Sequence, residues 1–171
     1  MEKSVRARIA EALLWLATIW WGVWFGGQLF NALMVVPIFS ASPPGSLTAW
    51  YQNRRTNVLD FFLVFNSLWI FLALLASLLV GWRSHGARRK WVAASAVAAL
   101  VATAFVLGWM APTIGRLITP GNGLSAEQSV ALLRLWTTAN WVRLGVEFCG
   151  FVFALRALSR GRATLSSGGG V

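Results

Sequence analysis

Four long apolar runs dominate the pattern of hydrophobic and polar positions along the 171-residue chain. The runs lie at about 9–36, 58–82, 91–111 and 130–158. The first run ends at Pro37 and the third at Pro112. Each run has the roughly 20 residues that a helix needs to cross the hydrocarbon core of a membrane. Because only helices and closed barrels satisfy their backbone hydrogen bonds in lipid, the pattern predicts an all-α, integral membrane four-helix bundle, with residues 1–160 as a single domain.

The segments between the runs are polar and rich in turn-forming residues. Residues 38–57 are expected to form a loop, and residues 83–90 form a short, strongly basic link. Ser125 is followed three residues later by Gln128, which predicts a capping box at the start of the fourth helix. Residues 161–171 are small and polar, so we expect a disordered tail.

The composition supports membrane insertion. Hydrophobic residues make up 57% of the chain and charged residues 12%, whereas a soluble domain has about 25% charged residues. The net charge of +10 is compatible with nucleic-acid binding in principle. However, most basic residues flank the apolar runs, where they orient a membrane protein, so we expect no nucleic-acid partner.

The distribution of basic residues predicts the orientation. In a four-span arrangement, ten of them lie on one side: Lys3, Arg6, Arg8, Arg83, Arg88, Arg89, Lys90, Arg156, Arg160 and Arg162. Three lie on the other side: Arg54, Arg55 and Arg116. Because the side richer in Lys and Arg faces the cytoplasm, both termini are expected there, in a bacterial-type inner membrane surrounded by lipid.

The fourth run contains polar residues at helical spacing. Trp136, Asn140, Arg143 and Glu147 follow each other at intervals of four, three and four, so they share one helical face. A charge near the middle of the bilayer costs at least ~2.5 kcal/mol, which requires this face to point into the bundle. We expect Arg143 and Glu147 to neutralise each other there.

Other apolar runs supply candidate partners for this face. Gln28 and Asn31 share a face of the first helix. The second helix is expected to begin near Asp60, with Asn66 about two turns deeper. All four are expected in the same half of the bundle, around a polar cluster with the Arg143–Glu147 pair as its floor. Two interpretations remain open at this point, a ligand pocket and a purely structural lock.

Several other residues have simpler interpretations. His85, the one histidine, belongs to the basic link, and carboxylates are few, so we predict no metal site and no cofactor. Cys149 is expected to be a small buried packing residue. Gly22 and Gly26 form a GxxxG pattern that predicts close helix packing. The tryptophans between residues 15 and 24 are expected to contact lipid and its interface.

The chain resembles the anthrone oxygenase-like family of small four-helix membrane proteins. The similarity rests on residues 26–37 (GGQLFNALMVVP) and on the W-x3-N-x2-R pattern of Trp136, Asn140 and Arg143. The resemblance implies a pocket within the membrane and, in the characterised branch, a cofactor-independent oxidation of an aromatic polyketide. Characterised members often have a histidine near this second motif, whereas Asn140 occupies that neighbourhood here.

Two functions from different classes are compatible with the sequence. The favoured hypothesis is an accessory or scaffold subunit that assembles with partner subunits in a larger membrane complex of respiratory or photosynthetic type. The alternative is an oxygenase-like membrane enzyme that acts on a hydrophobic aromatic or quinone-like molecule.

Overall fold

The computed structural model describes residues 2–53, 66–119 and 121–166, and within these ranges all regular structure is helical. The elements are α1 (Glu2–Phe30), η1 (Asn31–Val35), α2 (Val36–Ser40), α3 (Gly45–Asn53), α5 (Ser67–Val80), η2 (Gly86–Arg88), α6 (Arg89–Phe105), η3 (Val106–Met110), α7 (Ala111–Ile118) and α8 (Ala126–Ser166). Here η1 and η3 are π-helical turns and η2 is a short 3-10 helix. The prediction of an all-helical chain is confirmed for this part of the protein.

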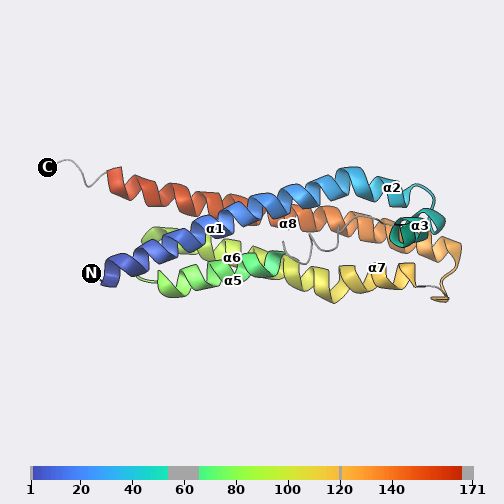
Figure 1. Cartoon of the computed structure of the whole chain (residues 1–171), viewed down its shortest axis with the longest axis horizontal. Helices are drawn as coiled ribbons and strands as arrows, with labels where there is room; N and C mark the ends of the chain where they lie inside the picture. Colours follow the sequence, from blue (N-terminus) through green and yellow to red (C-terminus); the bar gives the residue numbers. More distant parts are fainter. Residues whose placement is uncertain (1, 54–65, 120, 167–171) are drawn as a thin grey trace.

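The helices lie roughly along one common axis (Figure 1). The α1–η1–α2 and α6–η3–α7 segments and α8 each extend along much of the molecule, while α5 is shorter. Helix α8 packs against α6 and α1, and α5 packs against α1 and α6. The start of α1 and the end of α8 lie at the same end of the molecule, and α3 and α7 lie at the opposite end (Figure 1).

Both π-helical turns immediately precede a proline-containing helix. Pro37 and Pro112 lack a backbone N–H, and their rings clash with the carbonyl four residues earlier in a regular α-helix. In each turn a backbone N–H instead bonds to the carbonyl five residues back, which widens the helix. The helices therefore continue beyond the two prolines, where the apolar runs end.

The structure corrects two sequence predictions, one about the loop 38–57 and one about the C-terminal tail. Helix α3 lies inside residues 38–57, which were expected to form a loop. It forms because Leu47 is buried against the neighbouring apolar side chains, a tertiary contact that turn-forming residues do not reveal. Likewise, α8 continues to Ser166, within the expected disordered tail.

The start of α8 confirms the predicted capping box. The backbone N–H of Gln128 donates to Ser125 Oγ at 3.1 Å, and the backbone N–H of Ser125 donates to Gln128 Oε1 at 2.9 Å. The two side chains thus satisfy backbone donors that the first turn of a helix leaves without intrahelical partners.

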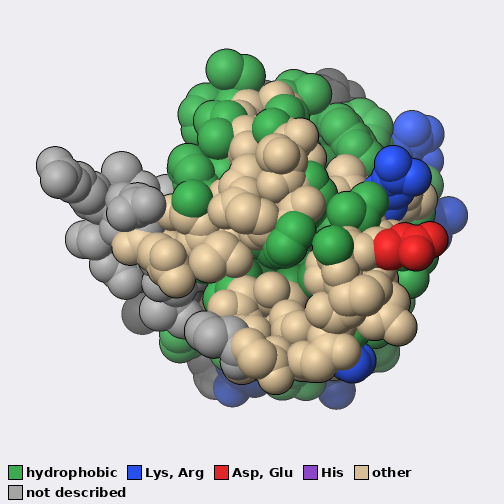
Figure 2. Space-filling model, turned by 90° about the vertical axis from the view of Figure 1, so that its right-hand side faces the viewer, with side chains coloured by type: hydrophobic (Ala, Val, Ile, Leu, Met, Phe, Trp, Pro, Cys, Tyr) green, Lys and Arg blue, Asp and Glu red, His purple; other side chains and the backbone are tan. Residues whose placement is uncertain are grey.

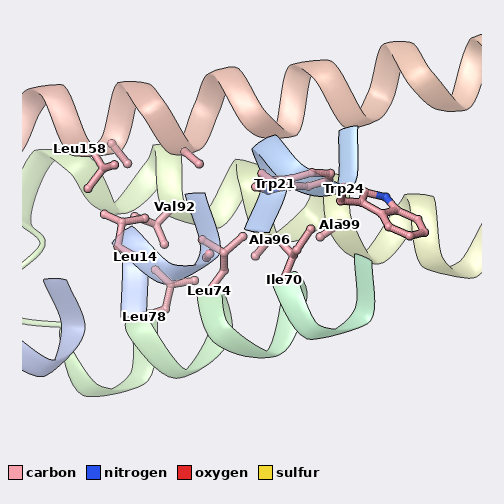
Figure 3. Packing of buried hydrophobic residues seen from close by; sticks show 13 residues of the cluster. Leu14, Trp21, Trp24, Ile70, Leu74, Leu78, Val92, Ala96, Ala99 and Leu158 are labelled. Carbon is pink, nitrogen blue, oxygen red and sulfur yellow. The ribbon is translucent and has the colours of Figure 1, made fainter. Parts of the chain in front are cut away.

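Two hydrophobic clusters occupy the two halves of the molecule. The first joins α1, α5, α6 and α8 near the chain ends, and Figure 3 shows Leu14, Ile70, Leu74 and Val92 meeting there. The second joins α2, α3, η3, α7 and α8, with Phe39 and Trp136 packed edge to face. Along α8, residues 140–147 lie between the two clusters.

Trp21 and Trp24 are buried in the first cluster, although the tryptophans of this stretch were expected to contact lipid. Trp21 Nε1 donates to Ser95 Oγ at 3.0 Å, so its polar atom is satisfied inside the core. A Cβ added to Gly150 would lie 2.6 Å from the Trp21 ring. The close approach therefore occurs at Gly150, and Gly26 of the predicted GxxxG pattern has no atom within 4 Å of its would-be Cβ.

Large apolar side chains cover much of the outer surface. Ile19, Val97 and Val142 are each at least 59% exposed. Cys149 is also exposed, which corrects the expectation that it is buried. Two helical stretches, Val5–Ser40 and Gly86–Ile118, are long and apolar enough to cross a membrane by length and composition.

Figure 2 looks onto the end of the molecule that carries α3 and α7. Hydrophobic side chains and neutral polar or backbone atoms make up most of this face, and charged side chains lie at its margin (Figure 2). The basic end of the chain, with the link 83–90, lies away from this view.

Candidate functional site

One face of α8 places four polar or amphipathic side chains in the interior. Trp136, Asn140, Arg143 and Glu147 are all buried, and Glu147 is fully inaccessible. Their spacing of about one helical turn keeps them on the same side of an unbroken helix. The remaining faces of this stretch carry exposed apolar residues such as Leu135 and Val142. The sequence pattern therefore places the polar groups away from the outer surface.

Arg143 connects α8 to α1. Its Nη2 donates to Asn140 Oδ1 at 2.8 Å and to Gln28 Oε1 through a short hydrogen bond. Gln28 is itself 3% exposed, so the contact between the two helices is buried. Hydrogen bonds to a charged group are stronger than neutral ones, so this contact is a strong polar link between α1 and α8.

Glu147 lies one turn further along α8, behind Arg143. Its Oε1 accepts from Trp24 Nε1 at 3.0 Å and lies 3.8 Å from Arg143 Nε. That separation permits Coulombic attraction but is too long for a hydrogen bond. Arg143 Nε and Glu147 Oε2 consequently have no hydrogen-bond partner within the described part of the chain. The ion pair is buried yet incompletely satisfied.

A cavity of about 410 Å³ borders this polar cluster. Most of its walls are apolar or aromatic: Trp24, Val35, Phe39, Trp50, Tyr51, Leu68, Val106, Leu107, Met110, Ala111, Ile114 and Trp136. Its polar lining consists of Gln28, Asn31, Asn66, Ser67, Thr103, Asn140 and Arg143. An apolar cavity with a few convergent polar groups is typical of a small-molecule site.

The two π-helical turns shape this cavity. Asn31 and Val35 belong to η1, and Val106, Leu107 and Met110 belong to η3. Trp136 Nε1 donates to the carbonyl of Met110 at 3.1 Å, which ties α8 to the end of η3. Because π-helical turns often occur at functional sites, the presence of both turns in the cavity lining supports a role for the cavity beyond packing.

The structure places the predicted site residues in three groups. Gln28, Asn140 and Arg143 line the cavity, and Glu147 contacts Arg143 from behind without being part of the lining. Asn31, Asn66 and Trp136 also line it. Asn66 is the N-cap of α5, where its Oδ1 accepts from Leu68 N at 3.0 Å. The sequence predicted a position about two turns inside the helix, and the structure corrects it. Asp60 lies outside the described residues.

Sequence reasoning did not identify Trp24 as part of this cluster. Trp24 lies four residues before Gln28, so both residues occupy the same face of α1. That spacing was the available signal, but the density of tryptophans nearby favoured an assignment to the lipid-facing surface.

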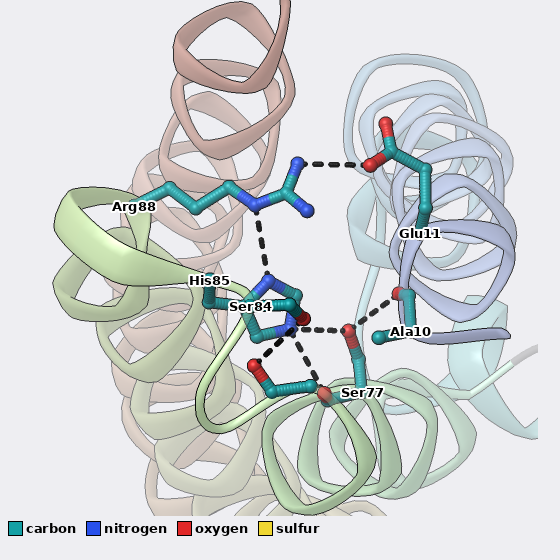
Figure 4. Close-up of polar contacts among 7 residues, drawn as sticks. Ala10, Glu11, Ser77, Ser84, His85 and Arg88 are labelled. Carbon is teal, nitrogen blue, oxygen red and sulfur yellow. Dashed lines mark hydrogen bonds and ion pairs between the residues drawn. The ribbon is translucent and has the colours of Figure 1, made fainter. Parts of the chain in front are cut away.

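A second buried polar cluster lies at the end of the molecule with the chain termini (Figure 4). Arg88 Nη1 donates to Glu11 Oε2 at 3.0 Å, and Arg88 Nε donates to His85 Nδ1 at 3.1 Å. Because Nδ1 accepts, the neutral imidazole carries its proton on Nε2, which donates to the carbonyl of Ser77 at 2.8 Å. Ser77 Oγ in turn donates to the carbonyl of Ala10 at 2.8 Å.

These contacts tie the basic link to α1 and α5. His85 is 2% exposed, and burial lowers the pKa of its imidazole below the ordinary value of 6.5. The sequence analysis placed His85 and Arg88 in a short, strongly basic link, and nothing in the local pattern indicates that both are buried.

In the described part of the chain, no group of three or more His, Cys, Asp or Glu side chains is placed to hold a metal ion. Comparison of the chain with protein-family models, curated proteins and solved structures gives no match.

Proposed function

We propose that the protein is an integral membrane four-helix bundle that binds a hydrophobic ring molecule, bearing at least one oxygen, in the cavity beside Arg143. The proposal has two parts, insertion in the membrane and ligand binding. Each part is supported by different features of the molecule and is tested separately.

The outer surface supports insertion. Large exposed side chains such as Ile19 and Val97 extend over α1 and α6, and contiguous apolar surface of this kind requires a partner or a lipid environment. The two long apolar stretches exceed the roughly 20 residues that a helix needs to cross the hydrocarbon core. The common position of the two chain ends, together with the basic residues near them, favours a cytoplasmic location for both termini.

Cysteine labelling of the intact cell tests this topology. A cysteine at position 86 is expected to be protected from an impermeant thiol reagent, and a cysteine at position 122 is expected to react. The native Cys149 is first replaced by serine, since it is exposed on the outer surface. Equal labelling of both positions would contradict the proposed insertion.

Arg143 is the observation that supports ligand binding most directly. A guanidinium is 5% exposed at the wall of a cavity with mostly aromatic and aliphatic lining. Its Nε has no hydrogen-bond partner among the described residues, and its carboxylate neighbour is 3.8 Å away. Positive charge is therefore only partly balanced beside the cavity. A carbonyl or phenolate oxygen of a ring compound complements that charge, while its rings fit the apolar walls.

The cavity volume also suits such a ligand. About 410 Å³ lies within the range of roughly 300–1,000 Å³ that small-molecule sites occupy. Trp24 of α1 and Trp136 of α8 both line the cavity and supply flat apolar surfaces for an aromatic ring. The resemblance to the anthrone oxygenase-like proteins favours the same class of ligand. If the protein catalyses a reaction of such a ligand, the role of Arg143 would be to stabilise negative charge that develops on the ligand oxygen.

Tryptophan fluorescence gives a binding assay. Alizarin, a hydroxylated anthraquinone, is the probe, and anthracene, which has the same ring skeleton without oxygen, is the comparison ligand. Removing a charged hydrogen-bond donor costs about 1.5–3 kcal/mol, so Arg143→Met is expected to weaken alizarin binding at least about tenfold. Anthracene binding is expected to change little. Arg134→Met is the matched control, since Arg134 is exposed on the same helix.

Because Arg143→Met alone leaves Glu147 without its counter-ion, the double variant Arg143→Met/Glu147→Leu is measured alongside it. A folded double variant that binds anthracene but not alizarin supports the proposal. Equal binding of alizarin to the wild type and to the folded double variant would refute it.

The accessory-subunit hypothesis makes a different prediction. It requires stoichiometric partner subunits to remain bound after purification in mild detergent, and it assigns the exposed apolar faces of α1, α6 and α8 to those partners. Purification of the chain without partners, combined with alizarin binding that depends on Arg143, favours the ligand-binding function.

A further inference from the structure

A second concentration of charge lies at the end of the molecule that carries the chain termini. Three exposed cations surround the indole ring of Trp91. Lys90 Nζ lies 5.6 Å from the ring centroid, Arg156 Cζ 5.0 Å and Arg160 Cζ 5.7 Å. The aromatic face attracts each cation, but the three like charges repel one another at this separation.

The protein supplies no counter-ion for this group among the side chains that the structure describes. The acidic side chains in that set are Glu11, Glu127 and Glu147. Glu11 pairs with Arg88, Glu147 pairs with Arg143, and Glu127 begins α8 at the opposite end. The positive charge around Trp91 is therefore unbalanced by the described part of the chain.

The start of α6 adds to this positive charge. A helix dipole places partial positive charge at the N-terminus, where acidic residues are favourable and basic ones unfavourable. Helix α6 begins with Arg89 and Lys90, has no acidic residue in its first turn and has no side-chain cap. An external anion at this position would stabilise both the helix start and the cations.

A further cation–aromatic contact lies beside this group. Arg89 stacks on Trp82, with its Cζ 4.1 Å from the ring centroid, so α6 begins among four cation–aromatic contacts. Phosphate oxygens accept hydrogen bonds from exposed guanidinium and ammonium groups and carry the negative charge that balances these cations.

The surface next to the cations is apolar. On α8, positions 148, 152, 156 and 160 are four residues apart, so each shares a face with the next one along the helix. Phe148 is 51% exposed and Val152 is 36% exposed, and the basic residues Arg156 and Arg160 follow on the next turns. The face thus changes from apolar to cationic along the helix axis, as a phospholipid changes from acyl chain to headgroup.

We infer that Lys90, Trp91, Arg156 and Arg160 form a binding site for the phosphate headgroup of an anionic phospholipid, whose acyl chain lies along Phe148 and Val152. The inference depends on the proposed membrane location but not on a ligand in the Arg143 cavity. The site would fix α6 and α8 to each other and to the cytoplasmic leaflet, where anionic lipids are abundant.

Lipid retention tests this site. The full-length protein is purified in neutral detergent from vesicles of phosphatidylcholine and phosphatidylglycerol, and retained lipid is measured by native mass spectrometry. Because each basic residue near an anionic surface strengthens binding, Arg156→Gln/Arg160→Gln is expected to lower phosphatidylglycerol affinity about tenfold to thirtyfold. The matched control is Arg116→Gln/Arg134→Gln, which removes two exposed charges at the opposite end.

The expected result is selective loss of phosphatidylglycerol in the first variant and retention in the control. Equal loss from both variants, or equal retention of the two lipids by the wild type, would overturn the site. Displacement by glycerol phosphate at the same concentration as the lipid would show that a soluble phosphate is the ligand and would overturn the lipid assignment. Alizarin binding by the Arg156/Arg160 variant, measured in parallel, distinguishes failure of this site from failure of the cavity proposal.

Discussion

Two arginine–glutamate pairs lie in the described part of the chain, one between the basic link and α1 and one within α8, and they differ in how fully their polar atoms are hydrogen-bonded. Arg88 bonds to Glu11 at 3.0 Å and to His85 at 3.1 Å, and Glu11 keeps 43% of its side chain exposed to solvent. Arg143 and Glu147 are both buried, lie 3.8 Å apart and leave one donor and one acceptor unsatisfied in the described part of the chain.

This difference separates a structural contact from a candidate binding site. The Arg88 cluster closes a network of hydrogen bonds that holds the basic link against α1 and α5. The Arg143 cluster borders a cavity, and behind that lining Arg143 Nε and Glu147 Oε2 have no hydrogen-bond partner among the described residues. A buried ion pair that is costly and incompletely satisfied is poor evidence of stability, and ligand binding is a better reason for its presence.

The largest expected effect concerns the deeper pair. Arg143→Met or Glu147→Gln alone is expected to lower the free energy of unfolding by about 3–5 kcal/mol, because each leaves a charged or polar group buried without its partner. The combined replacement Arg143→Met/Glu147→Leu is expected to recover much of that loss. Thermal unfolding in detergent measures all three, and simple additivity of the single effects would mean that the residues do not interact.

A smaller effect is expected at Gly81, beside the second cluster. A Cβ at this position would lie 2.6 Å from both Ala10 Cβ and His85 Nε2. Gly81→Ala is therefore expected to destabilise the protein by about 1–3 kcal/mol through overpacking. Gly26→Ala is the matched control, since its Cβ would meet nothing within 4 Å, and its effect is expected to stay within about 1 kcal/mol. Similar melting temperatures for both variants would contradict the close packing of the link.

The second cluster is also expected to make stability depend on pH. Burial lowers the pKa of His85, so this side chain takes up its proton at a lower pH in the folded protein than its ordinary pKa of 6.5 implies. The unfolded chain then binds more protons just below 6.5, and the stability from neutral His85 is present above that value and lost as the pH falls. Protonation would also add a hydrogen to His85 Nδ1, the atom that accepts the hydrogen bond from Arg88 Nε, so this bond would be lost.

His85→Gln tests this dependence, because glutamine offers a donor and an acceptor but does not titrate. The wild type is expected to lose melting temperature between about pH 7.5 and about pH 5.5, and the variant is expected to lose less. An equal decrease in both proteins would assign the pH dependence to other groups.

The smallest expected effect is at Glu11, the solvent-exposed partner of Arg88. Glu11→Gln is expected to cost no more than about 1 kcal/mol, since an ion pair with an exposed partner is weakened by solvent screening. Glu147→Gln is expected to cost more stability, because Glu147 is buried and Glu11 is exposed. A loss at Glu11 as large as that at Glu147 would show that exposure does not distinguish them.

The sequence predicts the interior face of α8 well because its polar residues repeat at the helical period within an apolar run. Arg143 and Asn140 illustrate this, since an unpaired charge facing lipid would be too costly. The partner Gln28 was predicted by the same reasoning, and the structure brings it to Arg143. The capping box at Ser125 is equally local, because the two residues that form it are three apart.

The remaining features depend on contacts between distant segments. Trp24 reaches Glu147 across 123 positions of the chain, and Arg88 reaches Glu11 across 77. No local pattern specifies which helix lies next to which, so the burial of His85 and the helix around Leu47 were not predicted. The π-helical turns also escaped prediction, because proline usually ends a helix unless the preceding turn widens.

Photo-crosslinking tests the central proposal, a ring-binding cavity beside Arg143, most directly. Benzophenone is an aromatic ketone that attaches to nearby C–H groups when irradiated, and it fits the proposed ligand class. Peptide mapping is expected to find the label at Met110, Val35 and Phe39, which line the cavity, and excess alizarin is expected to suppress it. Labelling confined to exposed residues of the outer surface such as Ile19 and Val97, unchanged by alizarin, would contradict the proposal.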